Sequence, residues 1–292
     1  MYKQLFSIFD TQIDKNFIYF DAACTYLKYR KTLEWISRYY EKYACCSGDR
    51  ESSALWSQLL SEITNIRKSI LNFVWANPQD ICIFTSSATD GINRVVRWID
   101  ISVIKHIVVT DIEHNSNYLP QYEFTREKNL KFTILSYIDL KDFWSLEWKL
   151  SKITSPFLFC CTQMSNITWE VFDIEAISRL VHKYGWYILV DATQFIASKQ
   201  EKFSHFDIDF LVFSAHKIGG PTGIGSLIIK KDSFQLLRNS TRLWWWTVKN
   251  IEKFTPNYKS DYAGFEWWVQ DFWGILGFWW CIKQIKDISY QK

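Results

Sequence analysis

Short apolar runs alternate with longer stretches of helical character along this chain, and that alternation restricts its fold more than any other feature. It is typical of an α/β fold with a mainly parallel sheet covered by helices. Helices are expected over residues 31–73, with a break near 45–49, and over 89–99 and 175–184. The expected strands are residues 18–21, 81–84, 106–110, 131–135, 157–161, 187–190 and 208–213.

Length and charge set the broad class of the protein. A chain of 292 residues can bury one large core or two modest ones. Its net charge of +3 offers no polybasic surface for nucleic acid or membrane, so neither partner is expected. The apolar runs are too short to span a bilayer and the first residues lack a signal-peptide pattern, which predicts a cytoplasmic protein.

The seven cysteines predict neither a metal site nor a redox site, because no two of them form a C-x-x-C pair. Cys82, Cys160 and Cys161 lie in strand-like apolar runs. We therefore expect these three to be small core residues rather than nucleophiles.

Lys217 lies between the apolar strand expected at 208–213 and a loop rich in glycine. Burial at the end of such a strand lowers the pKa of a lysine and favours the free amine that forms a Schiff base. Ser214 and His216 flank it with groups that can hydrogen-bond a phosphate, and the glycines let backbone approach a ligand closely. A lone lysine in a turn is more often a plain surface residue, so the rest of the chain must decide.

Two other junctions carry groups of matching chemistry. Ala88 and Thr89 lie where a strand turns into a helix, and the free N–H groups of a helix start attract anions. The serine- and threonine-rich run there could equally be a simple helix cap. Asp191 ends the strand expected at 187–190, at the edge where α/β folds bind ligands, although an N-cap is again the alternative.

The run Ser214-Ala-His-Lys217-Ile-Gly-Gly-Pro-Thr-Gly-Ile-Gly225 resembles the class V aminotransferase family of pyridoxal-phosphate (PLP) enzymes. It is most similar to the cysteine desulfurase and selenocysteine lyase branch, and the resemblance runs from about Tyr19 to the end. It implies a fold-type-I large domain, with a mainly parallel seven-stranded-type sheet, over residues 18–270. Residues 1–17 would be an N-terminal segment, and 271–292 a helix leading to a small C-terminal domain that this chain lacks.

The resemblance also assigns roles to individual residues. Lys217 would hold PLP as a Schiff base and shuttle protons, with assistance from His114, which matches the histidine that stacks on the pyridine ring. Asp191 would pair with the ring nitrogen, and Gln194 and Asn166 would lie near the cofactor's phenolic oxygen. Ser87 replaces a usual glycine and should tighten the phosphate loop. The expected cofactor contacts are Ala88, Thr89, His114, Asn166, Asp191, Gln194, Ser214, His216 and Lys217.

By this resemblance the protein is a homodimeric desulfurase. It would take sulfur from L-cysteine and leave alanine and an enzyme persulfide, which passes sulfur to an acceptor protein for iron–sulfur cluster assembly or another pathway. The family's catalytic cysteine and carboxylate-binding arginine lie in its C-terminal portion and have no counterpart here. The run 264–269 resembles F-E-x-G-T, whose threonine reaches the partner subunit's cofactor, but Val269 replaces that threonine. The alternatives are another class V enzyme (an aminotransferase, epimerase or kynureninase-like lyase) or an inactive fragment.

The chain has only 10 glycines against 16 tryptophans, where average usage gives about 20 glycines. Many of the tryptophans stand where the family has glycine or another small residue. Reading eleven of them as glycine would bring both residue types close to ordinary usage. We therefore hypothesise that the gene comes from a lineage that reads UGA as glycine. The positions concerned are Trp56, Trp75, Trp169, Trp244, Trp245, Trp246, Trp267, Trp268, Trp273, Trp279 and Trp280.

Overall fold

A seven-stranded sheet forms the centre of the computed structural model, which describes residues 2–12, 16–43, 53–198, 206–238, 248–266 and 271–289. Its spatial order is β1-β7-β6-β5-β4-β2-β3. Neighbours among β2 to β6 pair in parallel, and only β7 runs against its two neighbours. The expected mainly parallel sheet is confirmed. The strands are β1 (Ile81–Thr85), β2 (His106–Thr110), β3 (Lys131–Leu135), β4 (Phe157–Thr162), β5 (Tyr187–Asp191), β6 (Phe210–Ser214) and β7 (Gly225–Ile229).

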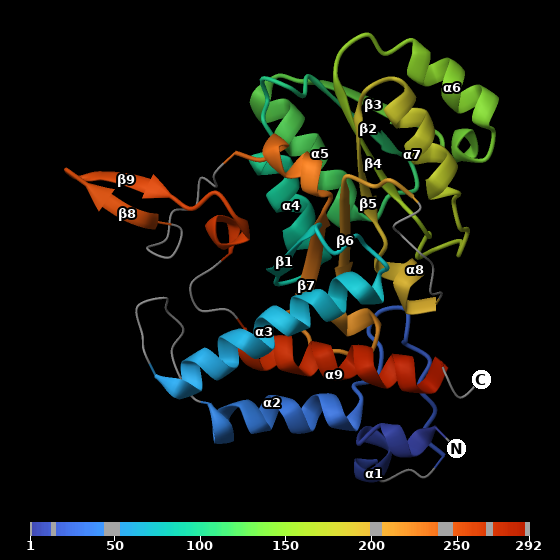
Figure 1. Cartoon of the computed structure of the whole chain (residues 1–292). Helices are drawn as coiled ribbons and strands as arrows, with labels where there is room; N and C mark the ends of the chain where they lie inside the picture. The colour runs from blue at the N-terminus through green and yellow to red at the C-terminus, as the bar shows by residue number, and fades with distance from the viewer. Residues whose placement is uncertain are drawn as a thin grey trace.

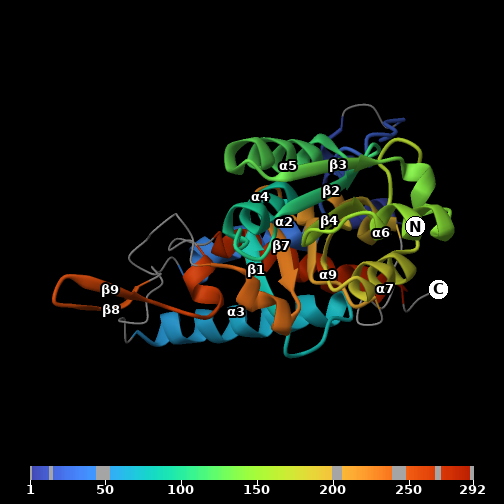
Figure 2. The ribbon, with the colours of Figure 1, turned by 90° about the horizontal axis from the view of Figure 1, so that it is seen from above.

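Helices cover both faces of the sheet (Figures 1 and 2). On one face lie α4 (Ala88–Trp98) and α5 (Asn115–Lys128). On the other lie α3 (Ala54–Phe73), α6 (Phe143–Ser151), α7 (Ile174–Lys183), α8 (Thr193–Ser198) and α9 (Phe272–Ser289). Helix α2 (Arg30–Lys42) packs against α9 near the short α1 (Ile8–Thr11), and a separate hairpin of β8 (Val248–Glu252) and β9 (Thr255–Tyr258) projects from the body in Figure 1.

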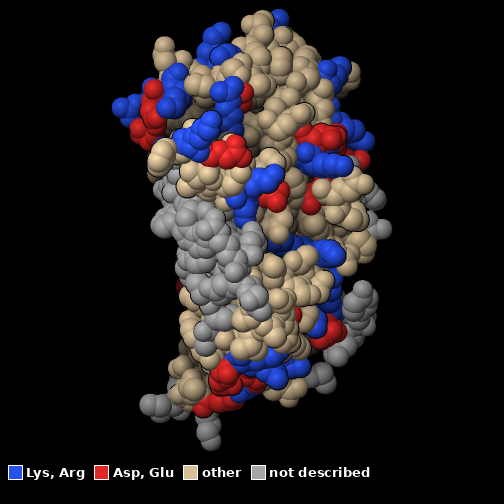
Figure 3. Space-filling view, turned by 60° about the vertical axis from the view of Figure 1, so that its left-hand side comes forward, with Lys and Arg blue, Asp and Glu red and all other residues tan. Residues whose placement is uncertain are grey.

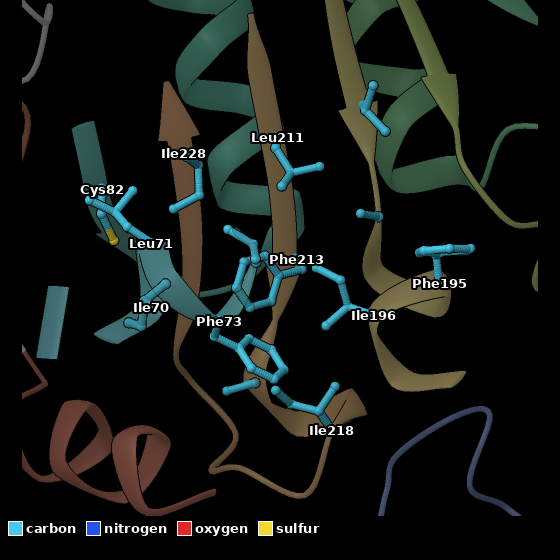
Figure 4. Packing of buried hydrophobic residues seen from close by; sticks show 14 of the residues in the cluster. Ile70, Leu71, Phe73, Cys82, Phe195, Ile196, Leu211, Phe213, Ile218 and Ile228 are labelled. Atoms are coloured by element: carbon cyan, nitrogen blue, oxygen red, sulfur yellow. The ribbon is translucent and has the colours of Figure 1, made fainter. Parts of the chain in front are cut away.

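Side chains of β6 fill the core on both faces of the sheet. Leu211 and Phe213 point towards the layer of α3 and α8, where Figure 4 shows Phe73 and Ile218 beside Phe213. Phe210 and Val212 point to the opposite layer, under α4. A strand buried on both sides needs apolar residues at every position, which is why this stretch is a continuous apolar run.

The strand expected at 18–21 is wrong. Residues 18–21 pair with no strand in the described part of the chain, and Ile18 and Phe20 are 67% and 89% exposed. Its alternating apolar pattern suits a half-buried strand, but it is equally compatible with an extended segment that has no strand beside it. Strand β7 is the converse case. The sequence analysis does not predict it, although its five residues are all buried.

The other expected elements agree with the structure to within two residues at most of their ends, and the long helix is indeed split into α2 and α3. Its break lies outside the described residues. On the face drawn in Figure 3, basic and acidic side chains are interspersed, in keeping with the small net charge. No helix among the described residues combines the length and apolar character needed to cross a membrane.

His182 on α7 fastens that helix to the segment before β6. Its ring nitrogens lie 2.9 Å from Asp207 Oδ2 and 2.8 Å from Asp209 Oδ2. The buried Asp209 carboxylate also accepts the backbone N–H of Ile188 and the hydroxyl of Ser233. The hydrogen bond to Asp209 raises the pKa of His182 above its ordinary value, so the folded protein favours the charged ring.

We expect His182 to stabilise the fold most at low pH. Its pKa in the folded state is raised, so this contribution is complete below the unfolded pKa of about 6.5 and is lost as pH rises through the folded pKa. Urea unfolding at a series of pH values should therefore show the wild type losing its advantage over His182→Gln as pH rises. A constant difference between the two proteins across that range would contradict the assignment.

Candidate active site

The carboxyl ends of the parallel strands meet at one edge of the sheet, here called the C-terminal edge. Thr162 lies opposite Asp191 in the β4–β5 register, and Ser214 lies opposite Gly225 at the start of β7. Open α/β sheets bind ligands outside this edge. The strands β2, β4, β5 and β6 end there at Thr110, Thr162, Asp191 and Ser214.

Lys217 lies just beyond β6, in a short 3-10 turn at this edge. Its half-buried Nζ donates to the carbonyl oxygen of Ala23 at 2.7 Å. Burial lowers the pKa of Lys217, and the charges of Cys24 and Asp191 partly oppose that shift. The lowered pKa increases the fraction of free amine at neutral pH, which is the form that attacks an aldehyde.

The segment 21–29 also lies at the C-terminal edge, which the sequence did not lead us to expect. Gln194 Nε2 donates to the same Ala23 carbonyl at 3.1 Å, so Gln194 and Lys217 converge on one backbone oxygen. The run of small residues after Asp21 was a signal of close approach. The side chains of this run carry little chemistry, however, so the run by itself does not predict a site.

Lys28 is a second amine near Lys217 that sequence reasoning missed. Its Nζ donates to Thr25 Oγ1, to Tyr26 O and to His216 O, at 2.8, 2.7 and 3.2 Å. Burial, together with the positive charge of Lys217, lowers its pKa to about 8. Its bonds tie the N-terminal segment to the turn that carries Lys217.

Asp191 is buried at the end of β5, and its Oδ1 accepts the backbone N–H of Thr193 at 3.0 Å. Burial raises its pKa, while the hydrogen bonds from Thr193 and the neighbouring His114 and Lys217 act in the opposite direction. These interactions place the three titratable groups in one electrostatic neighbourhood. A buried carboxylate here can hold a proton on a ligand nitrogen.

His114 follows β2 and is the N-cap of α5. Its Nδ1 accepts the backbone N–H of Ser116 at 3.1 Å, which fixes the orientation of the ring. Because Nδ1 is an acceptor, Nε2 carries the proton in the neutral ring. The ring is exposed at the C-terminal edge, so both its face and its Nε2 are accessible to a ligand.

The loop before α4 lies against the end of β6. Ser87 is the N-cap of α4 in extended backbone, and its hydroxyl accepts the N–H of Asp90. Ala88 N donates to Ser214 Oγ at 2.8 Å. A Cβ on Gly225 would lie 2.8 Å from the carbonyl carbon of Ser87, so the loop can sit this close only because Gly225 has no side chain. The cap hypothesis is thus confirmed for Ser87, and the first helical residues face the turn of Lys217.

The remaining predicted site residues lie around the same edge. Thr89 Oγ1 donates to Ser116 Oγ at 2.9 Å, which links the starts of α4 and α5. Asn166 is half-buried in the turn that follows β4. Burial and the nearby Lys217 lower the pKa of His216 to about 4, so its ring is neutral at physiological pH. The structure therefore places the nine predicted residues around the C-terminal edge of the sheet.

These groups fit a flat anionic aldehyde such as PLP. Lys217 offers a desolvated amine, Asp191 a buried carboxylate and His114 an exposed ring. The space left by Gly225 lets the start of α4 reach Ser214, three residues before Lys217. Trp244–Trp246 and Trp267–Val269, which the resemblance places near the cofactor, lie outside the described residues.

A family model and two named relatives match the sequence of this chain. The family model described as "Aminotransferase class-V" matches residues 18–263. A protein of Borreliella burgdorferi named "Probable cysteine desulfurase" is 30% identical over 295 residues, covering 97% of this chain and 69% of the relative. One of the same name from Ureaplasma parvum is 31% identical over 300 residues, covering 100% of this chain and 72% of the relative.

Among solved structures, the apo cysteine desulfurase of Thermococcus onnurineus superposes with a TM-score of 0.84. The match covers 94% of this chain and 68% of that one, at 23% sequence identity. At this identity the likeness speaks for the fold alone, and it agrees with the sheet order and helix layers described above.

Proposed function

This chain belongs to the aminotransferase class-V family, and on that premise we propose that it is a PLP-dependent cysteine desulfurase. Its substrate would be L-cysteine and its products alanine and a persulfide. The observation that carries the proposal is the grouping of Lys217, Asp191 and His114 at the C-terminal edge. The similarity to proteins named cysteine desulfurase supports this choice over an aminotransferase, epimerase or kynureninase-like lyase.

In this proposal PLP, when bound, supplies an electron sink that lets bonds at the substrate α-carbon break. Lys217 would hold the cofactor through Nζ and, as a free amine, would move a proton at the substrate α-carbon. Asp191 would hold the proton of the ring nitrogen. His114 would lie against the ring, with Nε2 left for proton transfer because Nδ1 accepts the Ser116 N–H.

The other predicted residues bind and orient. Ser214, His216 and the start of α4 at Ala88 and Thr89 hold the phosphate. His216 contributes as a neutral hydrogen-bonding ring. The residues that face the phenolic oxygen and the substrate carboxylate are Gln194 and Asn166.

Sulfur leaves the substrate by attack of a thiolate on the cysteine sulfur. A new S–S bond forms, the Cβ–S bond breaks, and its electron pair stays on carbon, where protonation gives alanine. Cys82, Cys160, Cys161 and Cys281 are buried, and burial raises the pKa of each thiol. They are core residues, as expected for the first three, and we assign the acceptor thiolate to none of them.

The direct test is to incubate the purified protein with PLP, L-cysteine and dithiothreitol as sulfur acceptor. We expect alanine and sulfide in equal amounts, and neither without PLP. Amino transfer to an oxo acid, or pyruvate and ammonia in place of alanine, would overturn the desulfurase proposal and favour another class V chemistry.

We further propose a homodimer that hands its sulfur to an acceptor protein, for iron–sulfur cluster assembly or a related pathway. The family resemblance as a whole implies the dimer, and Val269 cannot make the contact with the partner's cofactor that the family's threonine makes. Free thiols such as the adjacent Cys160 and Cys161 suit a reducing compartment, the cytoplasm. Sedimentation equilibrium of the purified protein tests the dimer, and a mass of one chain at micromolar concentration would contradict it.

We also propose that the natural protein has glycine at the suspect tryptophans, and that residues 18–270 form the cofactor-binding domain. Trp75 and Trp169 have φ values of 54° and 60°, the left-handed region that favours glycine. Trp56, Trp273, Trp279 and Trp280 lie in helices, whose right-handed backbone does not call for glycine. The other five suspect positions lie outside the described residues.

At Trp169 and Trp75 the glycine variant should be about 1 kcal/mol more stable than the alanine variant, because glycine adopts a left-handed backbone without steric cost. The two side chains are 52% and 44% exposed, and both replacements remove the same buried part of the tryptophan, so the comparison isolates the backbone. Trp144 is the matched control: it is 83% exposed in the regular helix α6, and glycine there should be about 1 kcal/mol less stable than alanine. Urea denaturation measures all six variants, and alanine variants as stable as the glycine variants at both left-handed positions would count against the recoding.

A further inference from the structure

Glu113, the residue before His114, joins three elements at the C-terminal edge. Its Oε1 accepts the hydroxyl of Thr110, the last residue of β2, at 2.5 Å. Its Oε2 accepts Asn117 Nδ2, from the first turn of α5, at 2.6 Å. Oε1 also accepts the backbone N–H of Thr162, the last residue of β4, at 3.0 Å. Three donors from three elements thus surround one carboxylate.

These contacts connect the neighbours of two predicted cofactor residues. His114 is next to Glu113 in the chain, so fixing this carboxylate fixes the backbone that carries the His114 ring. Thr162 is the register partner of Asp191, and its Oγ1 lies 3.4 Å from the Asp191 carbonyl oxygen. Gln163 N donates to the same carbonyl at 3.0 Å. Glu113 therefore connects the backbone of His114 with the end of β5, which carries Asp191.

Electrostatics make this position unusual for a structural carboxylate. Burial raises the pKa of Glu113 to about 7, the negative charge of Asp191 adds to that shift, and the three donors oppose it. The charge of Glu113 also acts on the thiols of Cys160 and Cys161 on β4, whose own pKa values are raised chiefly by burial. Around neutral pH, Glu113 can therefore carry a negative charge one strand away from Asp191.

We propose that Glu113 is a positioning residue of the PLP site, which holds His114 and the end of β5 in register and whose negative charge favours the protonated cofactor. This inference rests on the proposed function. It assigns Glu113 no direct contact with substrate. The shape and the charge of the side chain at position 113 should therefore have separate effects: on how tightly PLP binds and on the pH at which it loses its proton.

Glu113→Gln keeps the shape and removes the charge. We expect PLP to bind about tenfold more weakly, because one of the three hydrogen bonds must rearrange. We also expect the pH at which the visible band of the PLP-bound protein changes to fall by roughly half a unit, since a nearby negative charge no longer favours protonation. Glu113→Asp keeps the charge and should retain the wild-type transition pH while binding PLP more weakly.

Glu123→Gln is the matched control, because Glu123 is an exposed residue of α5 paired with Arg126 and its loss changes net charge equally. In this variant, the affinity for PLP and the transition pH of the visible band should both stay at the wild-type values. A Glu113→Gln protein with an unshifted transition pH would reduce Glu113 to a structural role and overturn the proposal. Should that variant not fold, a Glu113→Asp protein that binds PLP as tightly as wild type would overturn it instead. A wild-type protein that forms no visible band with PLP would contradict the proposed function itself.

Discussion

Replacing Lys217 with alanine lowers the rate of alanine formation from L-cysteine by about a thousandfold or more, since both the covalent link to the cofactor and the proton shuttle are lost. Lys217→Arg should be equally inactive. It keeps the positive charge and much of the length of the side chain, but its guanidinium stays protonated and cannot attack an aldehyde. Steady-state assays with PLP and dithiothreitol measure both variants.

Lys28 provides the comparison that makes this test specific. It lies beside the same turn and also has a lowered pKa, so it is the chain's most plausible rival amine. Lys28→Met should still attach PLP covalently, because the hydrogen bonds of Lys28 go to Thr25, to the Tyr26 carbonyl and to the His216 carbonyl, and this role is structural. Turnover by Lys217→Ala, or loss of covalent attachment in Lys28→Met, would move the assignment to Lys28.

Breaking the buried pair between Arg67 and Glu266 destabilises the protein by about 3–5 kcal/mol. The guanidinium of Arg67 on α3 meets the Glu266 carboxylate through two contacts of 2.5 Å, and both side chains are buried. Glu266 also accepts the backbone N–H of Phe84 in β1 at 2.7 Å, and Arg67 donates to the carbonyl of Cys82. Arg67→Met fills a similar volume but removes the guanidinium that pairs with this buried carboxylate.

The double variant separates a true pair from two independent losses. Arg67→Met combined with Glu266→Gln removes both charges, so it should lose much less stability than the two single changes added together. Urea unfolding of the four proteins gives the coupling free energy. Strictly additive losses would show that the two residues act separately and would contradict the pairing.

The sequence predicted most of the strands, including β5 and β6, whose residues are almost all buried, although it missed the equally buried β7. The end of β6 at Ser214 and of β5 at Asp191 follow from unbroken apolar runs that stop at a polar residue, so their positions at one edge could be expected. Residues 18–21 misled because alternation is also compatible with an extended segment that has no strand beside it. The resemblance added roles for residues whose own pattern left a helix cap as an equal alternative.

The sequence could not predict which residues far apart along the chain contact one another. Arg67 and Glu266 are 199 positions apart, and nothing in the composition around either one selects the other. The approach of Ala23 to Lys217 is a backbone contact, which no side-chain pattern encodes. The triple anchoring of Glu113 depends on strand ends that meet only once the sheet has formed.

The measurement closest to the central claim is the identity of the lysine that carries the cofactor. The protein is incubated with PLP, reduced with borohydride to fix the link, digested with trypsin and analysed by mass spectrometry. We predict a single reduced phosphopyridoxyl group, located on Lys217. A group on Lys28 or on another lysine, or no modified peptide at all, would contradict the account.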